Sequence, residues 1–354
     1  MTKSVLILNL DTFAAKNVSQ IRLMEAEGYD FTVATGDSRG TSRKVFEAAG
    51  FARSRLVTLA GLRDKLATVF RLLRTTRFHH VELYPAGRAA LVYLPLIKLF
   101  RQRLVVVERG DIASLHLYDA ATRLAVKLAY RLADCVVYKE TYMAPLLEAL
   151  SRAPLAFVPN SVEPRPVERA EPRQIDFLWA NRIVPQRRPE WVADAMAAPG
   201  LTGCSLVMLG VEPETTLDHH LPDRQRNLRA IAAPNIEIEA FVDPEPRYRQ
   251  ARFFCLPSEI VFGNNALLEA MASGVVPIVT EAPGVELIVE DGVNGIVVPL
   301  EEDAYREAMI RAAAMDEAEW LEMSRKAIEA VTNRYSPVEW TRRMREVYVR
   351  LGAG

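Results

Sequence analysis

The sequence predicts an α/β protein with two domains, each built on a parallel β-sheet. Short apolar runs alternate with helix-length segments along most of the chain, and strands separated by helices usually pair in parallel. This alternation breaks once, at residues 161–174, where three prolines and six charged residues occur without apolar periodicity. The chain has 354 residues, half of them hydrophobic, so it is long enough to bury two cores.

The segment before the break contains six runs that are typical of buried strands. They are SVLILNL (4–10), DFTVAT (30–35), HHVELYP (79–85), RLVVVE (103–108), ADCVVYK (133–139) and APLAFVPN (153–160). Helical patterns begin near Val18, Ser42 and Leu62. Together they predict one parallel sheet with crossover helices.

A second series of strand-like runs follows the break. It consists of IDFLWA (175–180), CSLVMLG (204–210), NIEIEAF (235–241), RFFCLP (252–257), VVPIVT (275–280) and GIVVP (295–299). Helices are expected near 190–197 and around Glu269, with Gly274 as the stop of the latter. Two Rossmann-like domains in tandem would place an active site in the cleft between them, facing the carboxyl ends of both sheets.

Cysteine usage and hydropathy indicate the cellular compartment. Cys135, Cys204 and Cys255 are far apart in apolar surroundings, which disfavours a disulfide framework or a thiolate metal cluster. The apolar run within residues 1–13 is too short for a secretory signal, and the run at 89–100 is too short to span a bilayer. We therefore expect a cytoplasmic protein that does not cross a membrane.

Charge is distributed unevenly along the chain. Residues 1–160 contain 23 Lys and Arg against 14 Asp and Glu, whereas the other 194 residues contain 21 against 31. The first half is thus net +9 and the second net −10. This asymmetry predicts that the first domain meets an anionic partner such as a membrane surface or lipid headgroup, and no nucleic-acid partner is expected.

The loop VFGNN (261–265) lies between a predicted strand and a predicted helix. Backbone N–H groups of Gly263, Asn264 and Asn265, with Ala266 next in the chain, are candidates to bind an anion at the helix N-terminus. Glu269, expected near the first helical turn, is a candidate ligand for ribose hydroxyls. The alternative is that Glu269 only complements the helix dipole.

Arginines follow the predicted strand at 175–180. Arg182 and Arg187 would lie at its carboxyl end, before a helix that begins near Pro189. Guanidinium groups bind planar oxyanion edges and stay charged, so this pair suits a diphosphate. A solvated basic loop is the alternative.

Five segments resemble motifs of the retaining GT-B glycosyltransferases of family 4, the glycosyl transferases group 1. They are FLWANRIVPQR (177–187), LLEAMASGVVPIVTEAPGVELIVEDGVNGIVVP (267–299), FVPNSVEP (157–164), NIEIEAFVD (235–243) and YSPVEWTRRMREVY (335–348). The resemblance is strong over 175–348 and weaker over 1–160. It implies an acceptor-binding domain at 1–165, a nucleotide-sugar-binding domain at 174–334 and a helix at 335–354 that crosses back to the first domain.

The resemblance also implies a reaction and its ligands. The chain would transfer a hexose with retention of configuration from a UDP- or GDP-sugar to a glycan or polyprenyl-linked acceptor, in bacterial surface-polysaccharide assembly. Arg182 and Arg187 would hold the donor diphosphate and Glu269 the ribose. Because the sequence has no Asp-x-Asp pair, no metal and no prosthetic group are expected.

The sequence departs from the family pattern at two places. Val261 occupies the position of the family's first glutamate, so either Glu259 substitutes for it or Asn264 and Asn265 hold the donor sugar. In the first domain, Glu108 or Arg109 occupies the place of a common histidine. Glu108 or Asp111 could accept an acceptor proton and Arg109 could bind an acidic group, or the three could form an internal charge cluster.

The segment 62–77 predicts a basic amphipathic helix. Leu62, Leu66, Val69, Phe70 and Leu73 would lie on one side, and residues 61–103 contain nine basic residues against two acids. Such a surface can rest on an anionic membrane leaflet, although an ordinary sheet-covering helix has a similar pattern.

Two other functions compete with sugar transfer. GDSRG (36–40) matches the Gly-x-Ser-x-Gly nucleophile motif and would make Ser38 the nucleophile of a hydrolase, but it follows only the second predicted strand. A glycosyltransferase-like partner protein without catalysis is the other, motivated by Val261 and the absent histidine.

Overall fold

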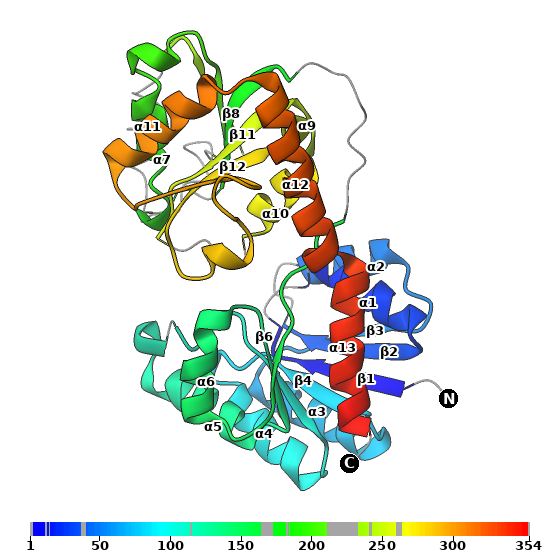
Figure 1. Ribbon diagram of the computed structural model, residues 1–354. Helices are drawn as coiled ribbons and strands as arrows, with labels where there is room; N and C mark the ends of the chain where they lie inside the picture. The colour runs from blue at the N-terminus through cyan, green and yellow to red at the C-terminus, as the bar shows by residue number, and fades with distance from the viewer. Residues whose placement is uncertain are drawn as a thin grey trace. The chain divides into compact units, whose positions relative to one another are not determined.

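The computed structural model describes residues 3–10, 13, 15–36, 40–113, 115–163, 173–181, 183, 185–210, 233–240, 243–259 and 264–352 (Figure 1). The chain forms two compact units. Unit 1 comprises Met1–Pro159 and Pro337–Gly354, and unit 2 comprises Asn160–Ser336. The chain therefore leaves unit 1 once and returns to it through its last helix.

Unit 1 is built on a seven-stranded sheet in the order β3-β2-β1-β4-β5-β6-β7, and every strand pair is parallel. The strands are β1 (Lys3–Leu8), β2 (Tyr29–Thr35), β3 (Arg55–Thr58), β4 (His80–Leu83), β5 (Leu104–Val107), β6 (Cys135–Tyr138) and β7 (Leu155–Phe157). The parallel α/β organisation predicted from the sequence is confirmed. The edge strand β3 was not predicted, because its four half-buried or exposed residues carry little apolar signal.

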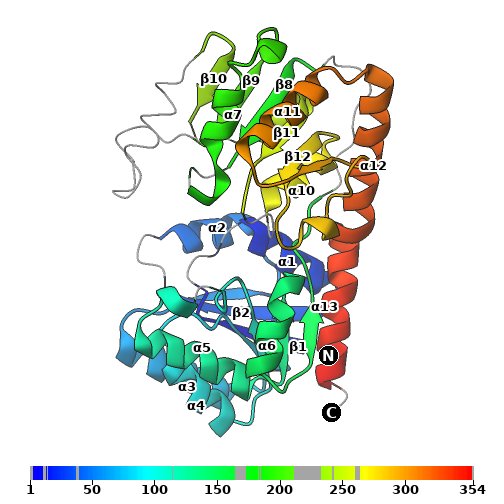
Figure 2. The same ribbon diagram turned by 60° about the vertical axis from the view of Figure 1, so that its left-hand side comes forward.

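The helices of unit 1 connect these strands. They are α1 (Ala15–Ala26), α2 (Thr41–Ala49), α3 (Leu62–Thr75), α4 (Ala90–Leu99), α5 (Ala120–Leu132), α6 (Ala144–Leu150) and the C-terminal α13 (Pro337–Gly352). Figures 1 and 2 show α13 beside α1, although more than 300 residues of sequence separate them. Trp340, Met344 and Tyr348 of α13 are buried in the same cluster as Val5 of β1 and Phe31 of β2. The last helix thus completes the core of unit 1.

Unit 2 has a six-stranded parallel sheet in the order β10-β9-β8-β11-β12-β13. Its strands are β8 (Ile175–Ala180), β9 (Leu206–Leu209), β10 (Ile236–Glu239), β11 (Ala251–Leu256), β12 (Val276–Thr280) and β13 (Ile296–Val298). Its helices are α7 (Pro189–Ala195), α9 (Glu245–Gln250), α10 (Asn265–Ala272), α11 (Glu302–Ala313) and α12 (Glu317–Tyr335).

Two buried clusters pack on opposite faces of this sheet. Leu178 and Phe254 belong to the cluster that α10 and α12 cover, whereas Phe177 and Phe253 belong to the one that α7 and α11 cover. Successive residues of one strand point to opposite faces of the sheet. Because helices cover both faces, these strands are apolar throughout.

The strand order reverses once in each sheet. In unit 1 the chain moves outward from β1 through β2 to β3 and then returns to β4 on the other side of β1. Unit 2 repeats this pattern, with β8, β9 and β10 followed by β11 beside β8. In doubly wound sheets, ligands bind at the carboxyl ends of the strands that flank this reversal. In unit 2, the residues after β8 and β11 are therefore the candidates for a ligand site.

Candidate active site

Asn181 and Asn264 connect the two strand ends at the reversal in unit 2. Asn181 directly follows β8, and Asn264 is the N-cap of α10, the helix that follows β11. The Asn264 side-chain oxygen accepts a hydrogen bond from the Leu267 backbone N–H at 3.2 Å, as an N-cap does. Its amide Nδ2 donates to Asn181 Oδ1 at 3.3 Å. The start of α10 is therefore fixed to the end of β8.

Arg187 joins this pair. Its guanidinium also donates a hydrogen bond to Asn181 Oδ1, so one amide oxygen accepts from both the arginine and Asn264. The Arg187 side chain is thereby held at the N-terminus of α10, where the helix dipole already favours an anion. Sequence reasoning selected Arg187 and Asn264 but missed Asn181, whose only signal was a polar residue directly after a buried strand.

Two buried amide atoms of this region have no hydrogen-bond partner among the described residues. They are Nδ2 of Asn181, which is a donor, and Oδ1 of Asn265, which is an acceptor. Buried polar groups are almost always satisfied, so an unpaired donor and an unpaired acceptor at one strand end are candidates for contacts with a ligand. The strand end is also tightly packed, because a Cβ on Gly210 would lie 2.4 Å from the carbonyl oxygen of Asn181.

Glu259 lies after β11 and is paired with an arginine that sequence reasoning missed. Its carboxylate accepts a hydrogen bond from the Arg188 guanidinium, and its backbone N–H donates to the Gln186 carbonyl oxygen at 3.0 Å. Arg188 in turn lies over the Trp191 ring, 4.6 Å from its centroid, with its backbone in a left-handed conformation. The signal for Arg188 was its place beside Arg187 in the same short loop.

The structure corrects the position of Glu269. It is the fifth residue of α10 and lies in the second turn, not the first, because the helix begins at Asn265. Asn265, Ala266 and Glu269 are the half-buried residues of this helix, and its other five side chains are buried. Glu269 is therefore on the same side of α10 as the residues at its start.

Several predicted residues fall outside the described part of the chain. They are Arg182, Val261 and Gly263 of the expected donor site and Ser38 of the alternative hydrolase. Of the predicted donor-site residues that are described, Arg187, Asn264 and Asn265 lie together at the end of β8.

Glu108 follows β5 in unit 1 and is fully buried. One carboxylate oxygen accepts hydrogen bonds from the backbone N–H groups of Gly110 and Ile112, and the other has no partner among the described residues. Burial, reinforced by the nearby Asp111 carboxylate, raises the pKa of Glu108 to about 7. The side chain can therefore either donate or accept a proton near neutral pH.

Arg109 and Asp111 point to different partners. The Arg109 side chain is exposed, and its guanidinium lies over the Tyr84 ring at 5.4 Å from the centroid. The Asp111 carboxylate is buried and accepts a hydrogen bond from the Tyr118 hydroxyl at 2.9 Å. Arg109 is thus a cation open to an anionic ligand at the carboxyl end of the sheet.

The described residues form neither a metal-ligand cluster nor a membrane-spanning helix. Within the described ranges, no three His, Cys, Asp or Glu side chains are grouped as metal ligands would be. No helix in the same ranges is long and apolar enough to span a bilayer.

Residues 174–315 match the family Glycosyl transferases group 1. No curated protein matches this chain. Among solved structures, the chain is similar to Anabaena HepE in complex with UDP and glucose, with a TM-score of 0.77 and 16% identity over 99% of this chain and 100% of that one. It is also similar to sucrose-phosphate synthase from Thermosynechococcus elongatus, with a TM-score of 0.79 and 16% identity over the full length of both.

A third similar structure is the pneumococcal O-GlcNAc transferase GtfA in complex with UDP and GlcNAc, with a TM-score of 0.74 and 11% identity over 99% of each chain. These likenesses establish the GT-B fold that the sequence predicted. The predicted resemblance to glycosyl transferases group 1 is confirmed over residues 174–315.

Proposed function

We propose that this chain, which has the GT-B fold and a glycosyl transferases group 1 domain at residues 174–315, is a retaining glycosyltransferase. It transfers a hexose from a nucleotide diphosphate sugar to a glycan or polyprenyl-linked acceptor, with UDP the favoured nucleotide and bacterial surface polysaccharide the favoured product class. UDP is favoured because the Anabaena and pneumococcal structures contain it. Unit 2 binds the donor and unit 1 the acceptor.

The observation that carries this proposal is the shared hydrogen bonding of Arg187 and Asn264 to Asn181. It holds a guanidinium at a helix N-terminus, at the carboxyl end of β8 and beside the reversal of the sheet. An arginine and a helix N-terminus together offer donors and positive charge to a diphosphate. The unpaired Asn181 and Asn265 amide atoms add one donor and one acceptor for the nucleotide sugar.

The diphosphate is the leaving group of the reaction, so its charge grows as the glycosidic bond breaks. Donors placed in advance at that position stabilise the transition state more than the ground state. We assign this role to Arg187, to Arg182 and to the backbone N–H groups from Gly263 to Ala266. With these groups present, the transfer requires no metal ion.

Glu269 and Glu259 receive different roles. Glu269 is half-buried on the same side of α10 as Asn265, from where it binds the ribose hydroxyls. Glu259 takes the place of the family's first glutamate and binds the donor sugar, with its carboxylate oriented by Arg188. The ion pair with Arg188 gives the displaced glutamate a fixed position, which the sequence did not reveal.

In unit 1, Glu108 and Arg109 serve the acceptor. Glu108, with its pKa raised to about 7 by burial, exchanges a proton with the acceptor hydroxyl. Arg109 is exposed over Tyr84 and binds an acidic or phosphate group of the acceptor.

Substitution of Arg187 tests the proposed donor site directly. UDP, GDP, ADP and their sugars are first ranked by the rise they cause in the unfolding temperature, since a ligand of the folded state stabilises it by mass action. Arg187→Ala is expected to weaken the binding of the nucleotide that ranks highest by about 2 kcal/mol, or about thirtyfold in Kd. The reason is the loss of a charge-assisted hydrogen bond. Titration calorimetry measures the affinity, and nucleotide release from the sugar donor measures the reaction.

Arg311→Ala is the matched control, because Arg311 is an exposed arginine of unit 2 on α11. Equal weakening by both variants contradicts a site at Arg187. If no nucleotide binds and no donor is turned over, the alternative of a non-catalytic partner protein, motivated by Val261, is favoured instead.

A further inference from the structure

The apolar side of helix α3 is wider than the part that the core covers. Val69, Leu72 and Leu73 are buried against the rest of unit 1. Leu62, Leu66 and Phe70, spaced four residues apart, are instead exposed by 63%, 47% and 38%. The sequence prediction that Leu62, Leu66, Val69, Phe70 and Leu73 share one side agrees with the helix, but the core covers only Val69 and Leu73 among them. An ordinary sheet-covering helix would need only the buried side.

The exposed side continues onto the end of α4. The Phe70 and Phe100 rings pack edge to face with centroids 5.2 Å apart, and the neighbouring Leu99 is 68% exposed. We call Leu62, Leu66, Phe70, Leu99 and Phe100 the apolar stripe. Four of its five side chains are exposed and Phe100 is half-buried, and an exposed group of large apolar side chains marks a surface that contacts something else.

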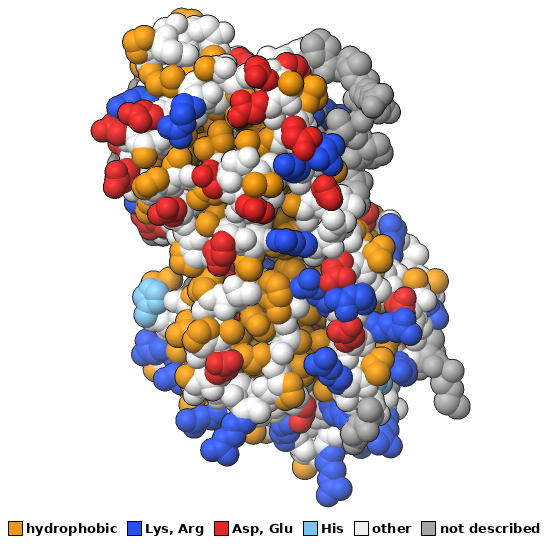
Figure 3. All heavy atoms as spheres, in the orientation of Figure 1, with side chains coloured by type: hydrophobic (Ala, Val, Ile, Leu, Met, Phe, Trp, Pro, Cys, Tyr) orange, Lys and Arg blue, Asp and Glu red, His pale blue; other side chains and the backbone are white. Residues whose placement is uncertain are grey.

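A groove lined by arginines adjoins the stripe. It lies at the amino ends of β4 and β5 and contains Arg74, Arg77, Arg101 and Arg103, together with Phe100 of the stripe. No acid lines this groove, and none of the four arginines forms an ion pair within the described part of the chain. In Figure 3, Lys and Arg side chains gather along the lower edge of unit 1, with few acids among them.

Burial keeps the histidine in the groove neutral. The pKa of His79 is lowered to about 4, first by burial, then by His80 and by the cations Lys3 and Arg103. The groove is thus positive at neutral pH without any contribution from this histidine.

We propose that the apolar stripe and the arginine groove dock unit 1 on a bilayer that contains anionic phospholipids. The stripe enters the boundary between headgroups and acyl chains, and the arginines bind the lipid phosphates. Large apolar side chains beside arginines give the two signals, burial and electrostatic attraction, that stable interfacial binding requires. The groove holds four of the 23 Lys and Arg residues of the segment 1–160, and no acid among the described residues lines it.

This docking does not depend on sugar transfer. The stripe and the groove use no residue of the proposed donor or acceptor sites, and vesicle binding can be measured without any nucleotide. Loss of one activity therefore does not imply loss of the other.

Co-sedimentation with vesicles tests the proposal. The full chain is mixed with vesicles of phosphatidylcholine, with or without phosphatidylglycerol, at low salt. We expect it to bind only the anionic vesicles. Arg74→Glu with Arg101→Glu should lower the binding by about thirtyfold or more, since each arginine near an anionic surface contributes a factor of about five to six. Leu66→Gln with Phe70→Gln should also lower it.

Lys44→Glu with Arg311→Glu is the matched control. Both residues are exposed, and the change in net charge is the same. The proposal is overturned if the wild type does not bind anionic vesicles, if either stripe or groove variant binds like the wild type, or if the control loses as much. Inorganic phosphate at matched ionic strength is expected not to displace the vesicles, and displacement would identify the groove as a site for soluble phosphate instead.

Phe70→Trp gives a second measurement on a protein that keeps an aromatic at the stripe. Because the chain already has four tryptophans, the wild-type spectrum under the same conditions is subtracted. The remaining indole emission should shift to the blue when anionic vesicles are added, because the ring leaves water. An unchanged spectrum also overturns the proposal.

Discussion

Glu108 shows how burial sets the chemistry of a single residue. Its carboxyl group has no exposed surface, two backbone N–H groups reach one oxygen, and the other oxygen has no partner in the described structure. The backbone hydrogen bonds favour the ionised form, but desolvation outweighs them and raises the pKa to about 7. A carboxyl that titrates near neutral pH is suited to proton transfer.

This shift predicts a pH dependence of stability. The pKa of Glu108 rises from an ordinary 4.5 to about 7, so between these values the native state keeps a proton that the unfolded chain has lost. Its contribution to the free energy of unfolding is thus fully present below the lower value and falls by about 3 kcal/mol as pH rises through the higher one. Glu108→Gln, neutral at every pH, should remove this loss.

Chemical denaturation of both proteins at about pH 5 and about pH 8 measures the difference. Glu47→Gln, at an exposed position of α2, serves as the control and should leave the wild-type dependence intact. The interpretation fails if Glu108→Gln loses as much stability with rising pH as the wild type.

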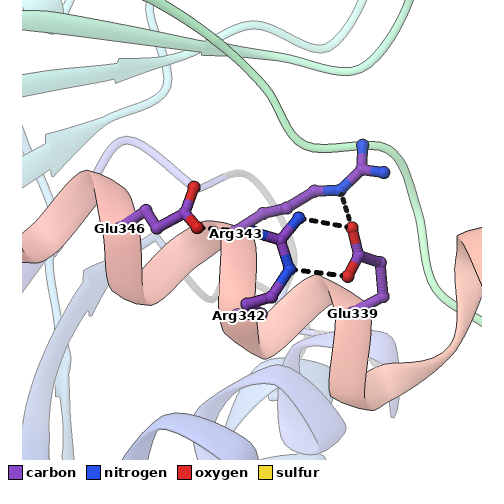
Figure 4. Close-up of polar contacts among 4 residues, drawn as sticks. All are labelled: Glu339, Arg342, Arg343 and Glu346. Carbon is purple, nitrogen blue, oxygen red and sulfur yellow. Dashed lines mark hydrogen bonds and ion pairs between the residues drawn. The ribbon is translucent and has the colours of Figure 1, made fainter.

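The C-terminal helix α13 combines a network of ion pairs within the helix with a buried hydrogen bond to the sheet. At its first turn Glu339 accepts hydrogen bonds from Arg342 Nη2 at 2.7 Å and from Arg343 Nε at 2.6 Å, and Arg342 also pairs with Glu346 (Figure 4). The Arg342 hydrogen bonds, with help from Arg343, lower the pKa of Glu339 to about 2. This network therefore keeps its charges at neutral pH.

On its buried side, α13 bonds to the sheet. The Tyr348 hydroxyl donates to a carboxylate oxygen of Glu82 on β4, and both side chains are buried. Tyr348→Phe would leave this carboxylate without its hydroxyl donor and is expected to lower the free energy of unfolding by about 1–3 kcal/mol.

Tyr130→Phe is the matched control for this prediction. Tyr130 is equally buried in unit 1, but its hydroxyl has no hydrogen-bond partner among the described residues, so its removal should have little effect or stabilise. Urea unfolding compares the two variants. Equal losses would mean that the hydroxyl of Tyr348 contributes no more than that of Tyr130.

At the scale of the whole molecule, unit 1 is assembled from both ends of the chain. Trp340, Met344 and Tyr348 supply part of the same core as β1 and β2, whereas unit 2 encloses two clusters of its own. The two units therefore differ in how they depend on the last 18 residues, Pro337–Gly354.

Truncation after Ser336 should expose this difference. Unit 1 would lose the apolar side of α13, whose several buried large side chains each contribute about 1.5–3 kcal/mol, and is expected to unfold. Unit 2 is expected to remain folded and to keep its affinity for the nucleotide. Amide hydrogen exchange, read separately for peptides of β1 and β8, distinguishes the units, and protection retained in β1 contradicts the prediction.

The sequence alone determined the architecture and the neighbourhood of the site. Apolar runs such as 175–180 and 275–280 could be recognised as strands because buried parallel strands are apolar on both faces, and the linker at 161–174 interrupted that pattern. The position of Arg187 and Asn264 after strand ends was likewise visible, since strand and helix boundaries depend on nearby residues.

Only the tertiary structure decided which side chains meet. Asn181 and Asn264 are 83 residues apart, and Tyr348 and Glu82 are 266 apart, so no local pattern relates them. The same limit applies to α3, where periodicity identified an apolar side but could not divide it into Val69, in the core, and Leu66, in solvent. Local periodicity reports which residues are apolar, whereas burial and pairing depend on elements that the chain brings together from far away.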